Sequence, residues 1–301
     1  MMLHASRALF APPGATLLGM LLAAGAGTAR AQGRIECSTV ASRILHQPVR
    51  YCAFLPPSYD AAAPAGTAAR RYPVLYDLHG LGDNEQSLIN TGAWSLIQDL
   101  RAERKIGEFL IVTPDGGQSF YINSQDGRER YSDFFLQEFI PAIERRYRVR
   151  AGRSGRGITG MSMGGYGALR FAFANPQLFA SVSAHSAALV AEPPRASQRE
   201  LSPLAAMLGE LFGNPIDVAF WNANSPFVLA RKNPVSRVKI YFDCGDQDRY
   251  GFENGAKALH EELGTLKVPH EFHIYPGGHD VEYLLDHLSA SMEFHSRAFG
   301  Q

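Results

Sequence analysis

The feature that most constrains the fold is a regular alternation of short, continuous apolar runs with helical patterns along most of the chain. The apolar runs cover residues 74–79, 109–113, 157–161, 179–184, 238–244 and 271–275. Runs of this length are typical of strands buried on both faces, as in a parallel sheet. The patterns that predict helices cover residues 93–104, 133–147, 163–174, 253–263 and 281–298. The alternation therefore predicts an α/β fold with a mostly parallel sheet and helices on both faces.

A different pattern precedes the first apolar run. Residues 35–56 alternate between apolar and polar and end at two prolines, which predicts an antiparallel hairpin and brings the sheet to about eight strands. Cys37 and Cys52 lie on the two arms of this hairpin, whereas Cys244 ends an apolar strand. Either Cys37 and Cys52 form a disulfide across the hairpin, or all three cysteines are small buried apolar residues.

One long segment, residues 186–232, does not follow the alternation. It has no strand pattern, and five prolines interrupt it, at positions 193, 194, 203, 215 and 226. We interpret it as an irregular, partly helical insertion above the carboxyl edge of the sheet, where open α/β sheets bind ligands.

The first 31 residues have the pattern of a signal peptide. His4 and Arg7 precede an apolar run over 15–27, and small residues at 29 and 31 fit a cleavage site. We therefore expect a secreted or periplasmic protein whose mature chain begins at about Gln32. The remaining residues 32–301 are enough for a single α/β domain with one large core.

The charge of the chain excludes some classes of partner. The sequence has 29 basic and 29 acidic residues and no lysine and arginine cluster. A near-neutral chain without such a cluster gives no electrostatic reason to expect nucleic acid or an anionic membrane as a partner. The sequence also has no HExxH motif and no CxxC pair, so we expect no metal and no cofactor.

A GxSxG motif, Gly160-Met161-Ser162-Met163-Gly164, lies between an apolar run and a helical pattern. A serine on such a strand-to-helix turn is typical of a nucleophile elbow, which presents the hydroxyl at the edge of the sheet. It also lies near the positive end of the following helix dipole. Its strand and helix context makes this short motif specific, and it predicts Ser162 as the nucleophile.

A serine hydroxyl needs a base, and the base needs an acid that orients it. His279 is the one histidine after Ser162 in a glycine-rich turn that directly follows a predicted strand, so it is the predicted base. Asp243, Asp246 and Asp248 all fit the position of the acid. Asp243 still belongs to the strand and Asp246 suits a turn that stabilises its own backbone, so Asp248 is the predicted acid.

The anion that forms in acyl transfer needs two backbone donors. The sequence predicts the amide of Met163, directly after the nucleophile, and the amide of Leu81 in the glycine-containing loop after the first apolar run. His79 precedes this loop and shares a strand face with Asp77. We expect these two residues to form a buried hydrogen-bonded pair that holds the loop.

Together these residues resemble the esterase D family of α/β-hydrolases, which includes feruloyl and acetyl xylan esterases, S-formylglutathione hydrolases and mycolyltransferases. The similarity also covers stretches at residues 55–59, 78–80, 114–117, 120–121, 139–141, 224–226, 245–248 and 277–280. It implies the α/β-hydrolase fold, a triad of Ser162, Asp248 and His279, and Leu81 and Met163 as oxyanion donors. Members of the family often have tryptophans shortly after the histidine, where this chain has Val281 and Leu284.

The predicted function is hydrolysis of carboxylic esters through an acyl-enzyme. Short-acyl or aromatic-acyl esters, such as acetyl or feruloyl groups on polysaccharides, are the expected substrates, because the insertion lacks the long amphipathic helix of an interfacial lid. Phe120, Tyr121 and Trp221 are the aromatic residues expected to stack against the acyl group. The alternatives are acyl transfer to a sugar alcohol, a thioesterase similar to S-formylglutathione hydrolase, and a binding protein without activity.

Overall fold

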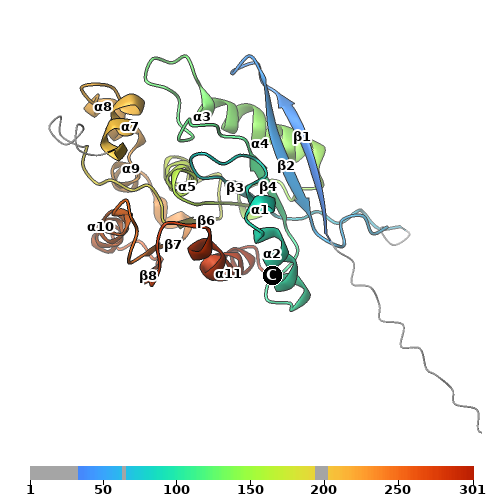
Figure 1. Ribbon diagram of the computed structural model, residues 1–301. Coiled ribbons are helices and arrows are strands. Elements are labelled where there is room, and N and C mark those ends of the chain that lie inside the picture. Colours follow the sequence, from blue (N-terminus) through green and yellow to red (C-terminus); the bar gives the residue numbers. More distant parts are fainter. Residues whose placement is uncertain (1–32, 63–65, 194–202) are drawn as a thin grey trace, which may run out of the picture. The chain divides into compact units, whose positions relative to one another are not determined.

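In the computed structural model, which describes residues 33–62, 66–193 and 203–301, eight strands form one sheet (Figure 1). The strands are β1 (Arg34–Ala41), β2 (Pro48–Leu55), β3 (Val74–Leu78), β4 (Leu110–Pro114), β5 (Arg156–Gly160), β6 (Ser181–His185), β7 (Lys239–Gly245) and β8 (Glu271–Tyr275). Their order in the sheet is β1-β2-β4-β3-β5-β6-β7-β8. β2 is antiparallel to both β1 and β4, and all other neighbours are parallel. The predicted α/β class, with a mostly parallel sheet of about eight strands, is confirmed.

Helices connect the parallel strands, as crossovers in a parallel sheet require. They are α1 (Ser87–Asn90), α2 (Ala93–Ala102), α3 (Tyr131–Phe134), α4 (Ile140–Arg146), α5 (Met163–Ala174), α7 (Pro203–Phe212), α8 (Val218–Asn224), α9 (Pro226–Lys232), α10 (Phe252–Thr265) and α11 (Val281–Ala298). A π-helical turn over Phe135–Phe139 joins α3 to α4 without a break. The helix predicted over 133–147 is thus one continuous helical segment.

The two faces of the sheet carry separate apolar clusters. On one face Val74 and Tyr76 of β3 belong to a large cluster that includes residues of α4, α5, α9 and α10. On the other face Leu75 packs in a smaller cluster with residues of α2 and α11, such as Leu100 and Met292. Figure 1 shows α2 and α11 side by side, and the contacts between them agree. The alternation of side chains along the central strand therefore decides which helices each residue meets.

The last strand, β8, differs from the prediction that every apolar run is buried on both faces. Glu271 and His273 are exposed, and the strand alternates between exposed and half-buried positions. Among the described strands β8 is the edge of the sheet and pairs with β7 alone, so its side chains have fewer neighbours than those of the central strands. The prediction of a strand was correct, but the prediction of full burial was wrong.

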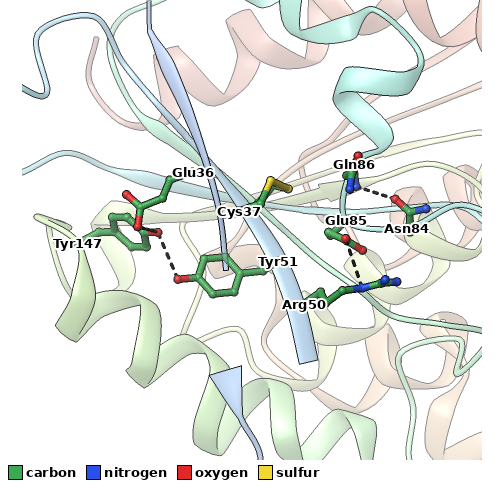
Figure 2. The surroundings of a disulfide bond; sticks show 9 residues. Glu36, Cys37, Arg50, Tyr51, Asn84, Glu85, Gln86 and Tyr147 are labelled. Carbon is green, nitrogen blue, oxygen red and sulfur yellow. Dashed lines mark hydrogen bonds and ion pairs between the residues drawn. A yellow bond between two sulfur atoms is a disulfide. The ribbon is translucent and has the colours of Figure 1, made fainter. Parts of the chain in front are cut away.

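A disulfide links the two arms of the hairpin at the opposite edge of the sheet (Figure 2). Cys37 and Cys52 lie directly opposite each other in the β1–β2 register, with Cα atoms 4.0 Å apart. Cys244 is buried and free. Cys37 and Cys52 are 15 residues apart in the sequence. A disulfide that closes a loop of this length typically stabilises a protein by about 3 kcal/mol.

Hydrogen bonds also connect the hairpin to the residue that follows α4. The hydroxyl of Tyr147 lies 3.2 Å from both the Tyr51 hydroxyl and a Glu36 carboxylate oxygen.

The insertion predicted over 186–232 is partly helical, as expected: it contains α7, α8 and α9, whereas residues 186–193 form neither helix nor strand. Part of it, residues 194–202, lies outside the described residues, as does the predicted signal peptide. α9 packs on α5, the helix that follows the GxSxG turn. Within the described ranges, none of the helices is long and apolar enough to span a membrane.

Candidate active site

Ser162 lies in a tight turn between β5 and α5, with backbone angles φ 56° and ψ −119°. A positive φ is uncommon for a residue with a side chain and places strain on the backbone at this position. Gly160 and Gly164 permit the turn, because a Cβ atom on either residue would overlap with the Leu78 carbonyl group. The sequence therefore forms the sharp strand-to-helix turn of a nucleophile elbow.

Hydrogen bonds from neighbouring strands hold this turn in place. The Ser162 amide donates to the His185 carbonyl at 2.9 Å, and the Ser162 carbonyl accepts from the Ala188 amide at 3.0 Å. His185 is the last residue of β6, so the turn is fixed by the strand next to its own. The strain at Ser162 is thus balanced by bonds that no local sequence pattern reveals.

His279 and Asp248 come together from the loops after β8 and β7. His279 Nδ1 lies 2.7 Å from Asp248 Oδ2, and the Asp248 side chain is buried. Burial alone would raise the pKa of Asp248, but the hydrogen bond and charge of His279 and the Tyr250 amide together lower it below its ordinary value. The ring of His279 also contacts Tyr250 and Phe252 edge-on. The imidazole is therefore fixed by an ionised carboxylate and by aromatic packing.

The two other candidate aspartates have different partners. Asp243, in β7, lies 2.9 Å from His185 Nδ1 and accepts a hydrogen bond from the Tyr283 hydroxyl. Asp246 is exposed and accepts a hydrogen bond from the Gly277 amide at 3.1 Å, so it holds the turn that carries His279. Of the three aspartates, Asp248 is the one that contacts His279.

Ser162 and His279 line one cavity of about 560 Å³ at the carboxyl ends of β3 and β5. Leu81 and Met163 also line it. Gly80 lies against the nucleophile, since a Cβ on Gly80 would be 3.8 Å from the Ser162 Cβ. The amide of Met163 is at the start of α5, where amides have no acceptor within the helix. Met163 thus directly follows the serine, and Leu81 lines the same cavity, while their role toward an anion stays a prediction.

The prediction that His79 pairs with Asp77 is wrong. His79 Nδ1 lies 2.8 Å from the Gly80 carbonyl, and His79 Nε2 accepts a hydrogen bond from the Gly116 amide at 2.8 Å. β3 ends at Leu78, so His79 is outside the strand and the strict alternation of faces no longer holds there. His79 still has the expected structural role, because its bonds join the loop after β3 to the loop after β4.

The three predicted aromatic residues have different surroundings. Phe120 lines the cavity, but Tyr121 is fully buried and does not. The Tyr121 ring fills the space left by Gly116 and Gly167, and its hydroxyl donates to the His79 carbonyl. Trp221 packs on Phe212 and lines a small neighbouring cavity together with Phe120. The prediction that all three line the catalytic cleft is therefore wrong for Tyr121 and Trp221.

Sequence reasoning missed the acidic residue on the inner wall of the cavity. Asp77 lies in the central strand β3 and is the one residue of that strand that is not fully buried. Burial raises its pKa from 3.8 to about 7, although charge interactions with His79 and His185 lower it in part. The sequence feature that could have pointed to Asp77 is the presence of a carboxylate inside the otherwise apolar run over residues 74–79.

Comparison with known proteins places these features in a family. The Esterase family model matches residues 42–294, which include Ser162, Asp248 and His279. Esterase Rv1288 of Mycobacterium tuberculosis is 30% identical over 237 residues, which cover 71% of this chain and 50% of that protein. The chain thus spans about half the length of this relative. An acetyl esterase of Caldicellulosiruptor saccharolyticus is 26% identical over 234 residues, which cover 74% of this chain and 83% of that protein.

Among solved structures, the chain is similar to a ferulic acid esterase. The TM-score is 0.74 at 28% sequence identity, and the match covers 89% of this chain and 99% of that chain. The similarity therefore extends over most of this chain and nearly all of that structure.

Proposed function

The chain belongs to the Esterase family of α/β-hydrolases, and from this premise we propose that it is a serine esterase that cleaves carboxylic esters through an acyl-enzyme on Ser162. The observation that carries the proposal is the 2.7 Å hydrogen bond between His279 and Asp248, in a site where His279 shares one cavity with the strained Ser162. A serine, a histidine and an acid in this chain order are the parts that acyl transfer needs.

In the first half of the reaction, Ser162 Oγ attacks the carbonyl carbon of the ester. His279 Nε2 accepts the serine proton, because Asp248 bonds to Nδ1 and keeps the proton of the neutral ring on that nitrogen. The amides of Leu81 and Met163 donate to the oxyanion. The intermediate then collapses, the bond to the alcohol oxygen breaks, and the alcohol leaves with the proton from His279.

In the second half, water takes the place of the alcohol. His279 removes a proton from the water as it attacks the acyl carbon, and the bond to Ser162 Oγ breaks when the second intermediate collapses. The serine regains its proton from His279, and the free carboxylic acid leaves the cavity. Asp248 remains ionised throughout, in agreement with its lowered pKa.

For the substrate class we propose short-acyl or aromatic-acyl esters. The similar ferulic acid esterase and acetyl esterase support this choice by their names. Phe120 lines the cavity and is placed to stack on an aromatic acyl group. The described helices of the insertion are short, with at most ten residues in α7, and none is the long amphipathic helix of an interfacial lid.

We expect acetyl, butyryl and feruloyl esters to be cleaved with a kcat/KM at least about tenfold above that of a palmitoyl ester, because a cavity of 560 Å³ limits the length of the acyl chain. The measurement is catalytic efficiency on the four esters of one alcohol under identical conditions. A palmitoyl ester that ranked first would make the enzyme a lipase and refute the proposed substrate class.

Activity should fall toward acidic pH. A protonated imidazole cannot accept the serine proton, so kcat/KM should decrease by about tenfold per pH unit on the acidic side of the profile. Asp248 is not the source of this loss, because its pKa is held below its ordinary value of 3.8. The measurement is kcat/KM from about pH 4 to about pH 9, with thermal unfolding over the same range to separate loss of fold. A flat profile in the folded range would contradict a histidine base.

We also propose that the protein is exported, on the basis of the signal pattern over residues 1–31. Expression of the full chain in a bacterium that exports through signal peptides should yield a product outside the cytoplasm that begins at Gln32. Mass spectrometry of that product is the test. A product that is cytoplasmic and retains the segment would refute export and leave the catalytic proposal unaffected.

A further inference from the structure

The cavity beside Ser162 has an inner end that the proposed reaction does not use. Asp77 of β3 lies at this inner end, and it pairs in register with Thr159 of β5. Thr159 lies within β5, whereas Ser162 lies in the turn beyond the end of this strand, so Asp77 is deeper along the sheet than the nucleophile. The cavity therefore extends well past the reacting atoms, toward α1 and α11.

The carboxylate of Asp77 is unpaired among the residues that the structure describes. In the described part of the chain, no hydrogen bond or ion pair involves its carboxylate, whereas the other acids at this end of the sheet are paired. An unpartnered carboxylate in a central strand is costly, which is the reason that its pKa is raised to about 7. Such a group in a cavity is a candidate for a functional role.

The polar neighbours of Asp77 already have other partners. Thr159 Oγ1 lies 2.6 Å from Ser183 Oγ. His185 Nδ1 bonds to Asp243, and His185 Nε2 lies 2.8 Å from Ser291 Oγ. The apolar residues Leu88, Leu284 and Leu288 line the cavity as well, together with Ser87 of α1, whose buried hydroxyl makes no hydrogen bond to a described residue. Asp77 is therefore the unpaired carboxylate of this cavity that remains available to a ligand.

The two ends of the cavity differ in their access to solvent. Leu81 and Tyr250, near the nucleophile, are 45% and 44% exposed. Thr159, His185 and Leu288, at the inner end, are at most 3% exposed. An alcohol that is part of a polysaccharide needs the open end, because its chain has to leave the protein. The acyl half of the ester therefore fits the closed end.

We propose that Asp77 is a specificity-determining residue that binds a hydroxyl group at the far end of the acyl moiety. Its carboxylate accepts a hydrogen bond from that hydroxyl, while the apolar walls formed by Leu88, Leu284 and Leu288 hold the body of the acyl group. This inference rests on the proposed ester hydrolysis and identifies its acyl class as hydroxyl-bearing aromatic acyl groups.

Leu284 contributes to this arrangement through its size. Together with Val281 it follows His279 on α11 and lines the cavity. Val281 is exposed and Leu284 is half-buried, so a larger aromatic side chain at position 284 would take up part of the cavity. The short aliphatic side chain of Leu284 therefore leaves more room for the acyl group.

The test compares two esters that differ by one hydroxyl group, methyl 4-hydroxycinnamate and methyl cinnamate. We expect the wild-type enzyme to favour the hydroxylated ester by roughly 10- to 100-fold in kcat/KM, since a site built to bond a hydroxyl rejects the analogue without it. In Asp77→Leu this ratio should fall to about one. Asp77→Asn, which keeps the shape and one acceptor, should retain part of the preference. Asp286→Asn, on the exposed face of α11, is the matched control and should leave the ratio unchanged.

Thermal unfolding shows whether the variants fold. The pKa of Asp77 is raised above its unfolded value of 3.8, so its protonated form favours the folded state and stability is lost as the pH rises toward about 7. Above that pH, Asp77→Asn and Asp77→Leu should therefore unfold at or above the wild-type temperature. A ratio near one in the wild type, or an unchanged ratio in Asp77→Leu, would overturn the inference.

If the protein is not a serine esterase, the outcome differs from that of a wrong role for Asp77: no ester is hydrolysed, and Ser162 is not labelled by a fluorophosphonate. Calorimetric binding of the two intact esters to Ser162→Ala, with and without Asp77→Leu, then decides the role of Asp77. Tighter binding of the hydroxylated ester that disappears with Asp77→Leu supports the inference, and equal affinities refute it.

Discussion

The Ser162→Ala variant is expected to lose ester hydrolysis by roughly a millionfold while the protein stays folded. The substitution removes only the attacking oxygen, and the backbone bonds that hold the turn, from Ser162 to His185 and Ala188, remain. The residual ester hydrolysis should come only from substrate binding and from the backbone amides that stabilise the oxyanion. The measurement is kcat/KM on a soluble acetyl ester, together with labelling by a fluorophosphonate, which the variant should lose entirely.

Ser95→Ala provides the matched control, because Ser95 lies on the exposed side of α2. It should keep both the activity and the label. Ser162→Ala activity within tenfold of the wild type would show that another residue forms the acyl-enzyme, and the proposed mechanism would then be wrong. Equal unfolding temperatures of the two variants would exclude loss of fold as the cause.

Asp248→Asn should lower kcat by about 10⁴-fold, the effect of this change in a related triad. An amide at position 248 can donate to His279 Nδ1, which moves the ring proton to Nε2 and leaves no acceptor for the serine proton. The fold should remain intact, because the Tyr250 amide keeps an oxygen acceptor in the asparagine side chain. The measurement is kcat on the same acetyl ester.

Asp246→Asn is the matched control for this prediction. It makes the same chemical change two residues away, and its remaining oxygen can still accept the hydrogen bond of the Gly277 amide. Its kcat should stay within about tenfold of the wild type, because Asp246 holds the turn and does not contact His279. Reversed effects of the two variants would show that Asp246 orients the base.

Local sequence patterns were sufficient for the strands, the helices and the serine turn. The helices predicted over Met163–Ala174 and Val281–Ala298 and the strand Glu271–Tyr275 have the same bounds in the structure. These elements depend on periodicity over a few neighbouring residues, and the glycines around Ser162 are required by contacts within one turn. The order of the strands, with β4 between β2 and β3, was not predicted from the sequence.

Position along the chain reduced the choice of an acid to three aspartates, but it could not show which of them contacts His279. Asp243, Asp246 and Asp248 lie within six residues, and each makes a different bond to another loop or strand. Strand and turn positions and the resemblance to a family favoured Asp248. The His279 contact itself depends on how the loops after β7 and β8 fold back, which is a tertiary property.

The incorrect predictions concern side chains whose surroundings come from distant segments. Tyr121 was expected in the cleft, but Gly116 and Gly167 leave room for its ring in the core. His79 was expected to bond Asp77, but its partner is the Gly116 amide from the loop after β4. The Tyr121 ring is accommodated by two glycines from other segments, and His79 bonds to a backbone amide of another loop, so neither contact gives a signal in a periodicity pattern.

The sequence by itself therefore determined the fold class, the elbow at Ser162 and the short set of residues for the acid and the base. Only the tertiary structure decided which aspartate contacts His279 and which aromatic residues reach the cavity. It also decided that Asp77 lies at the inner end of the cavity without a hydrogen bond or ion pair to a described residue. The physical reason is the range of the interactions. Periodicity and turn chemistry act between residues a few positions apart, whereas a cavity and its hydrogen bonds form between segments that only the folded sheet brings together.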